Sequence, residues 1–334
     1  MHHDAPSSGS PPATPQPPFI QPGKDHRSLL LPAPLLPILS NCLLSPDMYA
    51  FLKSHSIVNA ALFPSSGTLQ YDVKSKPTSL RSSIHILLTR ADLKFPSFIA
   101  LCSTSKRVML YFHGNATNLF EAEKMLELYA ADVGVTILAP EYPGYGPAQG
   151  RSTEDSIDEN ASATLRWILD KGVKPEDIII YGCSIGSGVA VKLAAELCAK
   201  STPPCALILQ SPYTCVSDVV QSLLGPYIAL LLLPRWRSLD RIRLVTCPTL
   251  FIHGEYDSTI PLEHSALLHA ASPALIKHVA LIPADHNSFK QLPHIIRPAK
   301  DFLEKILGDC VLSEDILSLR GANGMTGRLS TRLG

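Results

Sequence analysis

The stretch "IIIYGCSIGSG", residues 178–188, decides the fold, because it places a lone serine where an apolar run gives way to a helical pattern. The run 178–181 is typical of a buried strand, and a helix is expected from residue 184 onward. Gly182, Ser184 and Gly186 fit the pattern G-x-S-x-G in this strand–turn–helix context. We interpret Ser184 as a nucleophile on a tight turn; the alternative is a turn that uses glycine only for close packing.

Apolar runs and helical patterns alternate from about residue 80 to the end of the last expected helix. We expect strands within residues 82–90, 97–103, 107–114, 135–146, 177–182, 205–212, 248–257 and 277–286. Helices are expected within residues 119–132, 152–172, 184–200, 262–272 and 294–307. Because the strands are almost continuously apolar, the pattern predicts the α/β class, with a mainly parallel central sheet and helices on both faces.

The ends of the later strands carry two partners for Ser184. In such sheets ligands bind outside the carboxyl ends of the strands, so the residues just after each strand matter most. Asp257 follows the strand in "PTLFIHGEYD" and is the expected acid, with Glu255 as its local rival. His286, in "PADHNSF", is the expected base, and Asp285 beside it is a less suitable orienter. The order Ser, Asp, His along the chain is that of α/β-hydrolases.

The segment "YFHGNATNL", residues 111–119, ends the third expected strand with a His-Gly turn. This fold places part of its oxyanion hole there. We assign the oxyanion donors to the backbone N–H groups of Asn115 and of Ile185, the residue after the expected nucleophile. His113 is expected to shape the turn.

Composition narrows the class of protein and of site. The chain has 334 residues, of which 46% are hydrophobic, so it is long enough to bury a large core. Lys plus Arg equals Asp plus Glu, at 29 each, which gives no electrostatic reason to expect a nucleic-acid partner. The eight cysteines form no C-x-x-C pair, so we expect inert thiols in a reducing, cytoplasmic compartment and no metal. No cofactor is expected, and the oligomeric state is left open.

The chain is expected to have three parts. Residues 1–50 form a Pro-rich N-terminal segment, residues 55–308 a hydrolase domain, and residues 309–334 a flexible tail. The stretch 28–44 is apolar but broken by prolines, so it either packs on the domain or rests at a membrane surface. A small cap insertion is expected at about 213–246; its apolar part either covers the site or packs on the core.

Several blocks resemble the α/β-hydrolase domain-containing protein 17 family over roughly residues 55–306. They are "HSIVNAALFPS", "FHGNATNL", "EYPGYGPAQGRSTEDSIDENASATLRWI", "DIIIYGCSIGSGVAV", "LILQSPYTCVSDV", "CPTLFIHGEYDSTIPLEHS" and "PADHNSF". The resemblance implies an α/β-hydrolase fold, with Ser184, Asp257 and His286 as a catalytic triad. It also implies a serine hydrolase that removes palmitoyl groups from cysteines of membrane-associated proteins, with peripheral membrane contact.

The chain departs from that family at two places. Its first 41 residues contain no cysteine, whereas the family has a palmitoylated cysteine-rich N-terminus that recruits the enzyme to membranes. Cys183 precedes the expected nucleophile, where the family usually has glutamine. The alternatives are a lipid esterase or a serine aminopeptidase-like enzyme, because related branches share these motifs. A non-catalytic scaffold that retains the fold is the alternative of another class.

Overall fold

The computed structural model describes most of the expected hydrolase domain. The described residues are 82–88, 93–102, 104–115, 117–224 and 235–307. The expected segments 1–50 and 309–334 lie outside them, and so do residues 225–234 in the expected cap insertion. In the described part of the chain, no helix is both long and apolar enough to cross a membrane.

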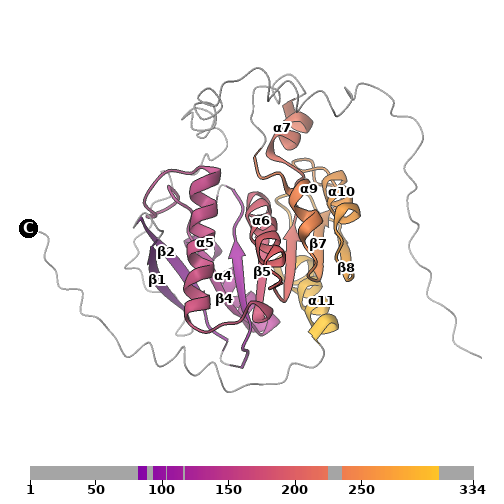
Figure 1. Cartoon of the computed structure of the whole chain (residues 1–334). Helices are drawn as coiled ribbons and strands as arrows, with labels where there is room; N and C mark the ends of the chain where they lie inside the picture. Colours follow the sequence, from indigo (N-terminus) through magenta and orange to yellow (C-terminus); the bar gives the residue numbers. More distant parts are fainter. Residues whose placement is uncertain (1–81, 89–92, 103, 116, 225–234, 308–334) are drawn as a thin grey trace, which may run out of the picture. The chain divides into compact units, whose positions relative to one another are not determined.

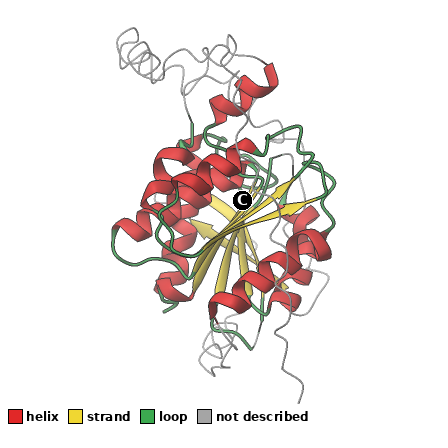
Figure 2. Ribbon diagram, turned by 90° about the vertical axis from the view of Figure 1, so that its right-hand side faces the viewer, coloured by secondary structure: helices red, strands yellow, loops and turns green. Residues whose placement is uncertain are grey.

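An eight-stranded sheet forms the centre of the fold, in the order β1-β2-β4-β3-β5-β6-β7-β8 (Figures 1 and 2). Its strands are β1 (Ser82–Leu88), β2 (Lys94–Ala100), β3 (Val108–Phe112), β4 (Thr136–Pro140), β5 (Ile178–Cys183), β6 (Ala206–Gln210), β7 (Thr249–Gly254) and β8 (Lys277–Ile282). The pairs β1–β2 and β2–β4 are antiparallel, and every other neighbouring pair is parallel. The prediction of a mainly parallel sheet is therefore confirmed.

Helices cover both faces of the sheet, as Figure 2 shows from the side. One apolar cluster joins one face to α4 (Leu119–Val133), η3 (Gln291–Ile296) and α11 (Arg297–Leu307). A second cluster joins the other face to α5 (Glu154–Asp170), α6 (Ile185–Ala199), α9 (Ser238–Arg241), η2 (Ile242–Leu244) and α10 (Glu263–Ala271). The remaining elements are η1 (Pro175–Asp177) and α7 (Val216–Leu224).

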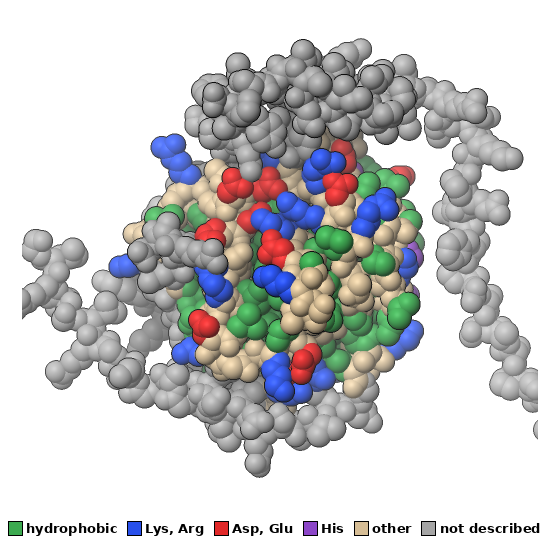
Figure 3. Space-filling view, in the orientation of Figure 1, with side chains coloured by type: hydrophobic (Ala, Val, Ile, Leu, Met, Phe, Trp, Pro, Cys, Tyr) green, Lys and Arg blue, Asp and Glu red, His purple; other side chains and the backbone are tan. Residues whose placement is uncertain are grey.

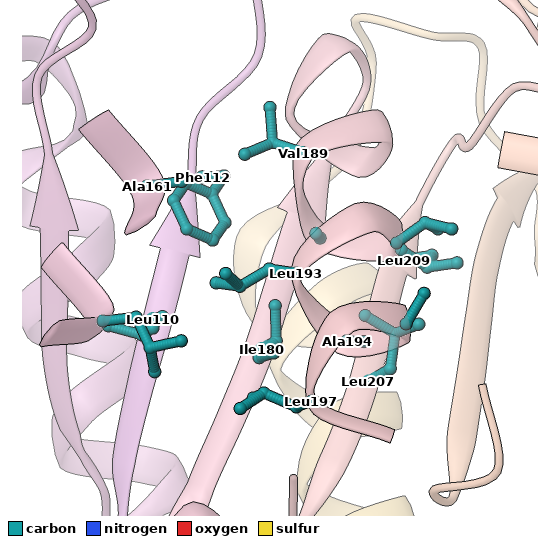
Figure 4. Packing of buried hydrophobic residues seen from close by; sticks show 14 of the residues in the cluster. Leu110, Phe112, Ala161, Ile180, Val189, Leu193, Ala194, Leu197, Leu207 and Leu209 are labelled. Atoms are coloured by element: carbon teal, nitrogen blue, oxygen red, sulfur yellow. The ribbon is translucent and has the colours of Figure 1, made fainter. Parts of the chain in front are cut away.

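Strands β3 and β5 are buried along their length, which explains their unbroken apolar sequences. Figure 4 shows the α6 side of this core, where Leu193 and Leu197 lie over β5 near Ile180. Full burial of one such leucine side chain contributes about 1.5–3 kcal/mol relative to its exposure. On the face shown in Figure 3, acidic and basic side chains are interspersed.

The register of the central strands brings their carboxyl ends to one edge. Phe112 of β3 pairs with Gly182 of β5, and Cys183 pairs with Gln210 of β6. The loops that follow these strands therefore begin side by side. The sheet thus positions the turn at Ser184 between the loop after β3 and the loop after β6.

The two ends of the expected cap insertion meet at the base of α7. The backbone N–H of Val216 donates to the carbonyl oxygen of Arg235 at 3.1 Å. Trp236 follows at once and is buried, with its backbone N–H donating to Glu154 Oε1 and its indole Nε1–H donating to Asp158 Oδ1, both at 2.9 Å. Two carboxylates of α5 therefore hold the returning chain against the core.

Helix α5 begins with a capping box. Its N-cap is Thr153. Its hydroxyl accepts from the Ser156 N–H at 3.1 Å, and Ser156 Oγ accepts from the Thr153 N–H at 2.9 Å. A serine thus fills the position usually held by Glu or Gln, and the reciprocal box still satisfies two helix-end donors.

Thr153→Ala should lower the free energy of unfolding by about 1 kcal/mol, because it leaves an N-terminal donor of α5 without its acceptor. Urea denaturation followed by circular dichroism measures the change. Thr153→Ser keeps the capping oxygen and is the matched control. Equal stability of the alanine variant and the wild type would contradict this role for Thr153.

Candidate active site

Ser184 lies on a strained turn between β5 and α6. It is the N-cap of α6, with φ 50° and ψ −118°. Non-glycine residues seldom adopt positive φ, and such strain clusters at functional sites. The Ser184 N–H donates to the Gln210 carbonyl oxygen at 2.9 Å, which ties the turn to the end of β6.

The two glycines around Ser184 are required by close backbone approach. A Cβ atom on Gly182 would lie 2.6 Å from Cα of Ser187 and 2.7 Å from Cβ of Ala190. A Cβ atom on Gly186 would lie 2.7 Å from the His113 carbonyl oxygen. All three distances are too short for a real Cβ atom, so the first turn of α6 packs against β5 and the end of β3 only because these positions lack side chains.

The three residues predicted from the strand ends lie in hydrogen-bond contact. Ser184 Oγ is 3.1 Å from Nε2 of His286, and Nδ1 of His286 is 2.8 Å from Oδ2 of Asp257. The other carboxylate oxygen of Asp257 accepts the backbone N–H groups of Thr259 and Ile260, at 3.0 and 2.8 Å. With Nδ1–H donating to the carboxylate, the neutral ring presents Nε2 as an acceptor to the Ser184 hydroxyl.

The environment of Asp257 favours its charged form. Burial acts to raise the pKa of the carboxyl group, but the hydrogen bonds from His286 and from the Ile260 N–H outweigh it, and the pKa falls below its ordinary value. Its rival Glu255 is exposed to solvent. The Asp285 carboxylate accepts from the backbone N–H and hydroxyl of Ser258, at 3.2 and 3.3 Å. Asp285 therefore braces the His286 loop against the Asp257 loop.

His253, near the end of β7, supports the loop of Asp257. Its ring is buried, and Nε2 lies 2.8 Å from the Ile260 carbonyl oxygen while Nδ1 lies 2.7 Å from Ser265 Oγ. Burial lowers the pKa of His253, so the ring is neutral, donates from Nε2 to the carbonyl and accepts the serine hydroxyl. These contacts span 7 and 12 residues of the chain, and no local motif indicates them.

The His-Gly turn after β3 lies beside Ser184. A Cβ atom on Gly114 would be 3.7 Å from Cβ of Ser184, an ordinary van der Waals distance. Asn115 follows at once, and its Oδ1 accepts from the Tyr145 hydroxyl at 2.7 Å. Ile185 is the first residue of α6, and its carbonyl oxygen accepts from the Tyr213 hydroxyl at 3.1 Å. Both assigned oxyanion donors therefore stand on segments next to Ser184, while their role stays a prediction.

Glu141, a buried carboxylate beside His113, was not among the residues predicted from the sequence. Nε2 of His113 lies 3.1 Å from Oε1 of Glu141, with both side chains buried. Glu141 Oε2 accepts the Leu119 N–H at 3.1 Å, and the Tyr142 hydroxyl donates to the His113 carbonyl oxygen at 2.8 Å. The Glu-Tyr-Pro-Gly-Tyr sequence after β4 was the available signal, because polar residues there directly follow a buried strand.

A pocket of about 650 Å³ opens over Ser184 and His286. Residues of α7 form part of its wall, among them Val216, Val219 and Val220. Cys183 also lines it, and burial raises the pKa of this thiol to about 12, helped by the charge of Asp257. The thiol is therefore protonated at neutral pH and contributes an inert surface.

Within the part of the chain that the structure describes, no group of three or more His, Cys, Asp and Glu side chains is placed to hold a metal ion. What the arrangement offers chemically is a hydroxyl, a base that can take its proton, and a carboxylate that orients the base.

Gly182→Ala should destabilise the fold by roughly 1–3 kcal/mol or more, because its Cβ would overlap the first turn of α6. Gly114→Ala is the matched control from the same site, since its Cβ would meet the Cys183 sulfur at an ordinary 3.6 Å. Chemical denaturation of the purified variants measures both changes. Equal tolerance of the two alanines would show that close approach does not fix the glycine.

Comparison with known families and curated proteins finds relatives that are named as a lipase and as alpha/beta hydrolase domain-containing proteins. Residues 82–274 match the family described as Chlamydia CHLPS protein (DUF818). Lysophosphatidylserine lipase ABHD12 of Danio rerio is 29% identical over 228 residues, which cover 60% of this chain and 59% of that protein. Alpha/beta hydrolase domain-containing protein 17B of Homo sapiens is 27% identical over 211 residues, covering 63% and 70%.

A third relative, protein bem46 of Schizosaccharomyces pombe, is 28% identical over 69% of this chain and 76% of its own. The chain spans about half to three-fifths of the length of the ABHD12 relatives that it matches. Among solved structures, an alpha-beta hydrolase from Vibrio vulnificus has a TM-score of 0.61 at 17% identity, covering 79% of this chain and 93% of that one. The Pyrococcus furiosus esterase Pf2001 has a TM-score of 0.55 at 15% identity, covering 67% and 92%. At these identities the two structures show a shared fold.

Proposed function

We infer a hydrolytic function because the chain belongs to the family described as Chlamydia CHLPS protein (DUF818), within the α/β-hydrolase superfamily. We propose that it is a serine hydrolase of long-chain acyl esters and thioesters. The observation that carries this proposal is the relay from Ser184 through His286 to Asp257, at 3.1 and 2.8 Å, which begins on a strained turn. Strain of this kind persists only where the surrounding structure maintains it.

Acyl transfer would begin at the Ser184 hydroxyl. Nε2 of His286 takes the proton as Oγ attacks the substrate carbonyl carbon, and the resulting oxyanion accepts from the N–H groups of Ile185 and Asn115. His286 then gives the proton to the leaving thiol or alcohol, which departs and leaves an acyl-serine. A water molecule, deprotonated by the same ring, releases the fatty acid and restores the hydroxyl.

Asp257 has two tasks in this scheme. Its carboxylate accepts Nδ1–H of His286, so the neutral ring keeps Nε2 free to act as the base. It also stabilises the imidazolium that forms when the ring takes the proton. The low pKa of its carboxyl group keeps the charge in place at neutral pH. The backbone donors at Thr259 and Ile260 fix the carboxylate orientation.

An apolar acyl group is favoured by the α7 side of the pocket. Val216, Val219 and Val220 line this side together with Tyr213. Each methylene that leaves water contributes about 0.8 kcal/mol, so a long chain gains most from such a wall. The finer substrate that we propose is a palmitoyl thioester on a protein cysteine. It is supported by the similarity to alpha/beta hydrolase domain-containing protein 17B and by the blocks that carry the family resemblance.

The cellular location that we propose follows from the proposed substrate. S-acylated proteins lie at membranes, so we propose peripheral contact with the cytoplasmic face of a membrane. The six cysteines in the described residues are free thiols, which fits a reducing compartment.

A lipid esterase is the second candidate function. The observation in its favour is the similarity to the lysophosphatidylserine lipase of Danio rerio, whose name states a lysophospholipid substrate. An ester and a thioester of the same fatty acid require the same relay and the same acyl wall. The two candidates therefore differ at the leaving group, on the opposite side of the scissile bond.

Hydrolysis of acetyl, octanoyl and palmitoyl thioesters tests the proposal. We expect kcat/KM to rise with chain length, and Ser184→Ala to lower it by at least about a thousandfold, because the nucleophile is lost. Val219→Asp should reduce the gain from the longer chains by placing a charge in the acyl wall.

Ser222→Asp is the charge-matched control for the α7 variant, because Ser222 is exposed on the same helix and lies outside the pocket lining. It should leave the chain-length dependence unchanged. A Ser184→Ala variant as active as the wild type would overturn the proposed nucleophile. A wild type that hydrolyses palmitoyl lysophospholipids but no thioester would favour the lipid esterase, and a folded wild type inert toward every acyl substrate would favour a scaffold.

A further inference from the structure

We propose that Glu121 makes this enzyme select acyl esters and thioesters whose leaving group carries positive charge, and discriminate against anionic leaving groups. The inference rests on the proposed function, since it concerns the same pocket and the same acyl transfer. It specifies which charge is preferred on the group that leaves when Ser184 is acylated. The two candidate functions differ in this leaving group.

Glu121 stands at the rim of the pocket, directly beyond the turn assigned to the oxyanion hole. It lies in the first turn of α4, whose N-cap is Asn118, and it is exposed to solvent while it lines the pocket. Its Oε2 accepts the hydroxyl of Thr117 at 3.2 Å, and Thr117 lines the same pocket. The carboxylate is thus held at the rim by a neutral neighbour.

The charges around the pocket are uneven. Among the described residues that line it, Glu121 is the only acid, and none is Lys or Arg. The described chain also offers no ion-pair partner to this carboxylate. Two histidines complete the titratable lining apart from tyrosine and cysteine: His113 beside Glu141, and His286 as the base. Among the described lining residues, a charged group that enters therefore meets one carboxylate directly, whereas the Asp257 carboxylate lies behind the His286 ring.

The sheet order separates the two sides of the substrate. Strand β5, which leads into Ser184, lies between β3 and β6. On the β6 side the pocket wall is formed by valines of α7. On the β3 side α4 supplies Glu121 beside Ala122 and Met125, and the segment before α4 supplies Thr117. Helix α4 packs with η3 in the same apolar cluster, and η3 adds the polar Gln291 to this rim. An acyl chain on the α7 wall leaves its leaving group to the α4 side.

The consequence for specificity is electrostatic. A carboxylate at a partly solvated rim attracts a cation and repels an anion within a few ångströms, and salt screens the effect. An amine-bearing or Lys- and Arg-flanked leaving group gains, whereas a leaving group with a phosphate or carboxylate loses. This argument favours S-acylated cysteine in a basic peptide over an anionic lysophospholipid.

The test uses three substrates that share one acyl chain. They are octanoyl thiocholine, which is cationic, octanoyl thioglycerol, which is neutral, and octanoyl thioglycolate, which is anionic. The purified full chain and its Glu121→Gln variant are compared through kcat/KM at low and high salt. Asp132→Asn is the matched control, because it removes the same charge from α4 about three turns away, outside the pocket lining.

In the wild type we expect the cationic thioester to exceed the anionic one in kcat/KM. Glu121→Gln should lower that ratio by about threefold to tenfold, mostly through KM, and leave the neutral substrate within about twofold. High salt should shrink the wild-type ratio toward that of the variant. Asp132→Asn should leave the ratio unchanged.

Two contrary results are distinguishable. If Glu121→Gln leaves the cation-to-anion ratio unchanged while the neutral thioester is still hydrolysed, this inference fails and the proposed function stands. If the wild type hydrolyses none of the three thioesters, the proposed function fails and the inference falls with it. A merely structural role at the start of α4 would change all three substrates by the same factor and leave the ratio constant.

Discussion

The close approach of α6 to the ends of β3 and β5 is the constraint on which the site depends. Gly182 and Gly186 let the first turn of the helix pack where any Cβ atom would overlap backbone. The chain between them then has one path, which holds Ser184 at φ 50° with its hydroxyl facing His286. The strain at the serine is thus a consequence of packing, and the buried cores on both faces of the sheet maintain it.

Buried polar contacts also hold the loops that contain Asn115 and Asp257 in place. Glu141, at the end of β4, contacts His113 and also accepts a donor from the start of α4, so one carboxylate fixes both ends of the turn that holds Asn115. His253 does the same for the loop of Asp257. Removing a single member would leave a buried polar atom unpaired, which costs about 1–3 kcal/mol. Such networks restrict each loop to one arrangement.

Much of the fold follows from local sequence. Alternating apolar runs and helical patterns predicted the order of strands and helices, because a strand buried on both faces cannot tolerate polar residues. Ser184 was predicted from the G-x-S-x-G pattern, whereas Asp257 and His286 were predicted because parallel strands end at the same edge of the sheet and because they follow the serine in the order of α/β-hydrolases. The structure brings the three side chains into hydrogen-bond contact, and their catalytic roles remain proposals.

What sequence could not supply are contacts between distant segments. The pairing of His113 with Glu141 depends on β4 lying beside β3, so the polar residues after β4 indicate that Glu141 matters but do not indicate its partner. Ser152 and Thr153 are both good caps for α5, and only the path of the chain decides that Thr153 is the N-cap. In the sequence Glu121 is an ordinary acidic residue in the first turn of a helix, and only the structure shows that it lines the pocket.

The most direct test of the central claim is to locate the adduct of a long-chain fluorophosphonate by intact and peptide mass spectrometry of the full chain. The account predicts one phosphonate per chain, on Ser184, because among the described residues this serine lines the pocket and contacts a base that is itself hydrogen-bonded to a carboxylate. An adduct on a different serine, or none on a folded chain, would contradict the assignment of Ser184 as the nucleophile.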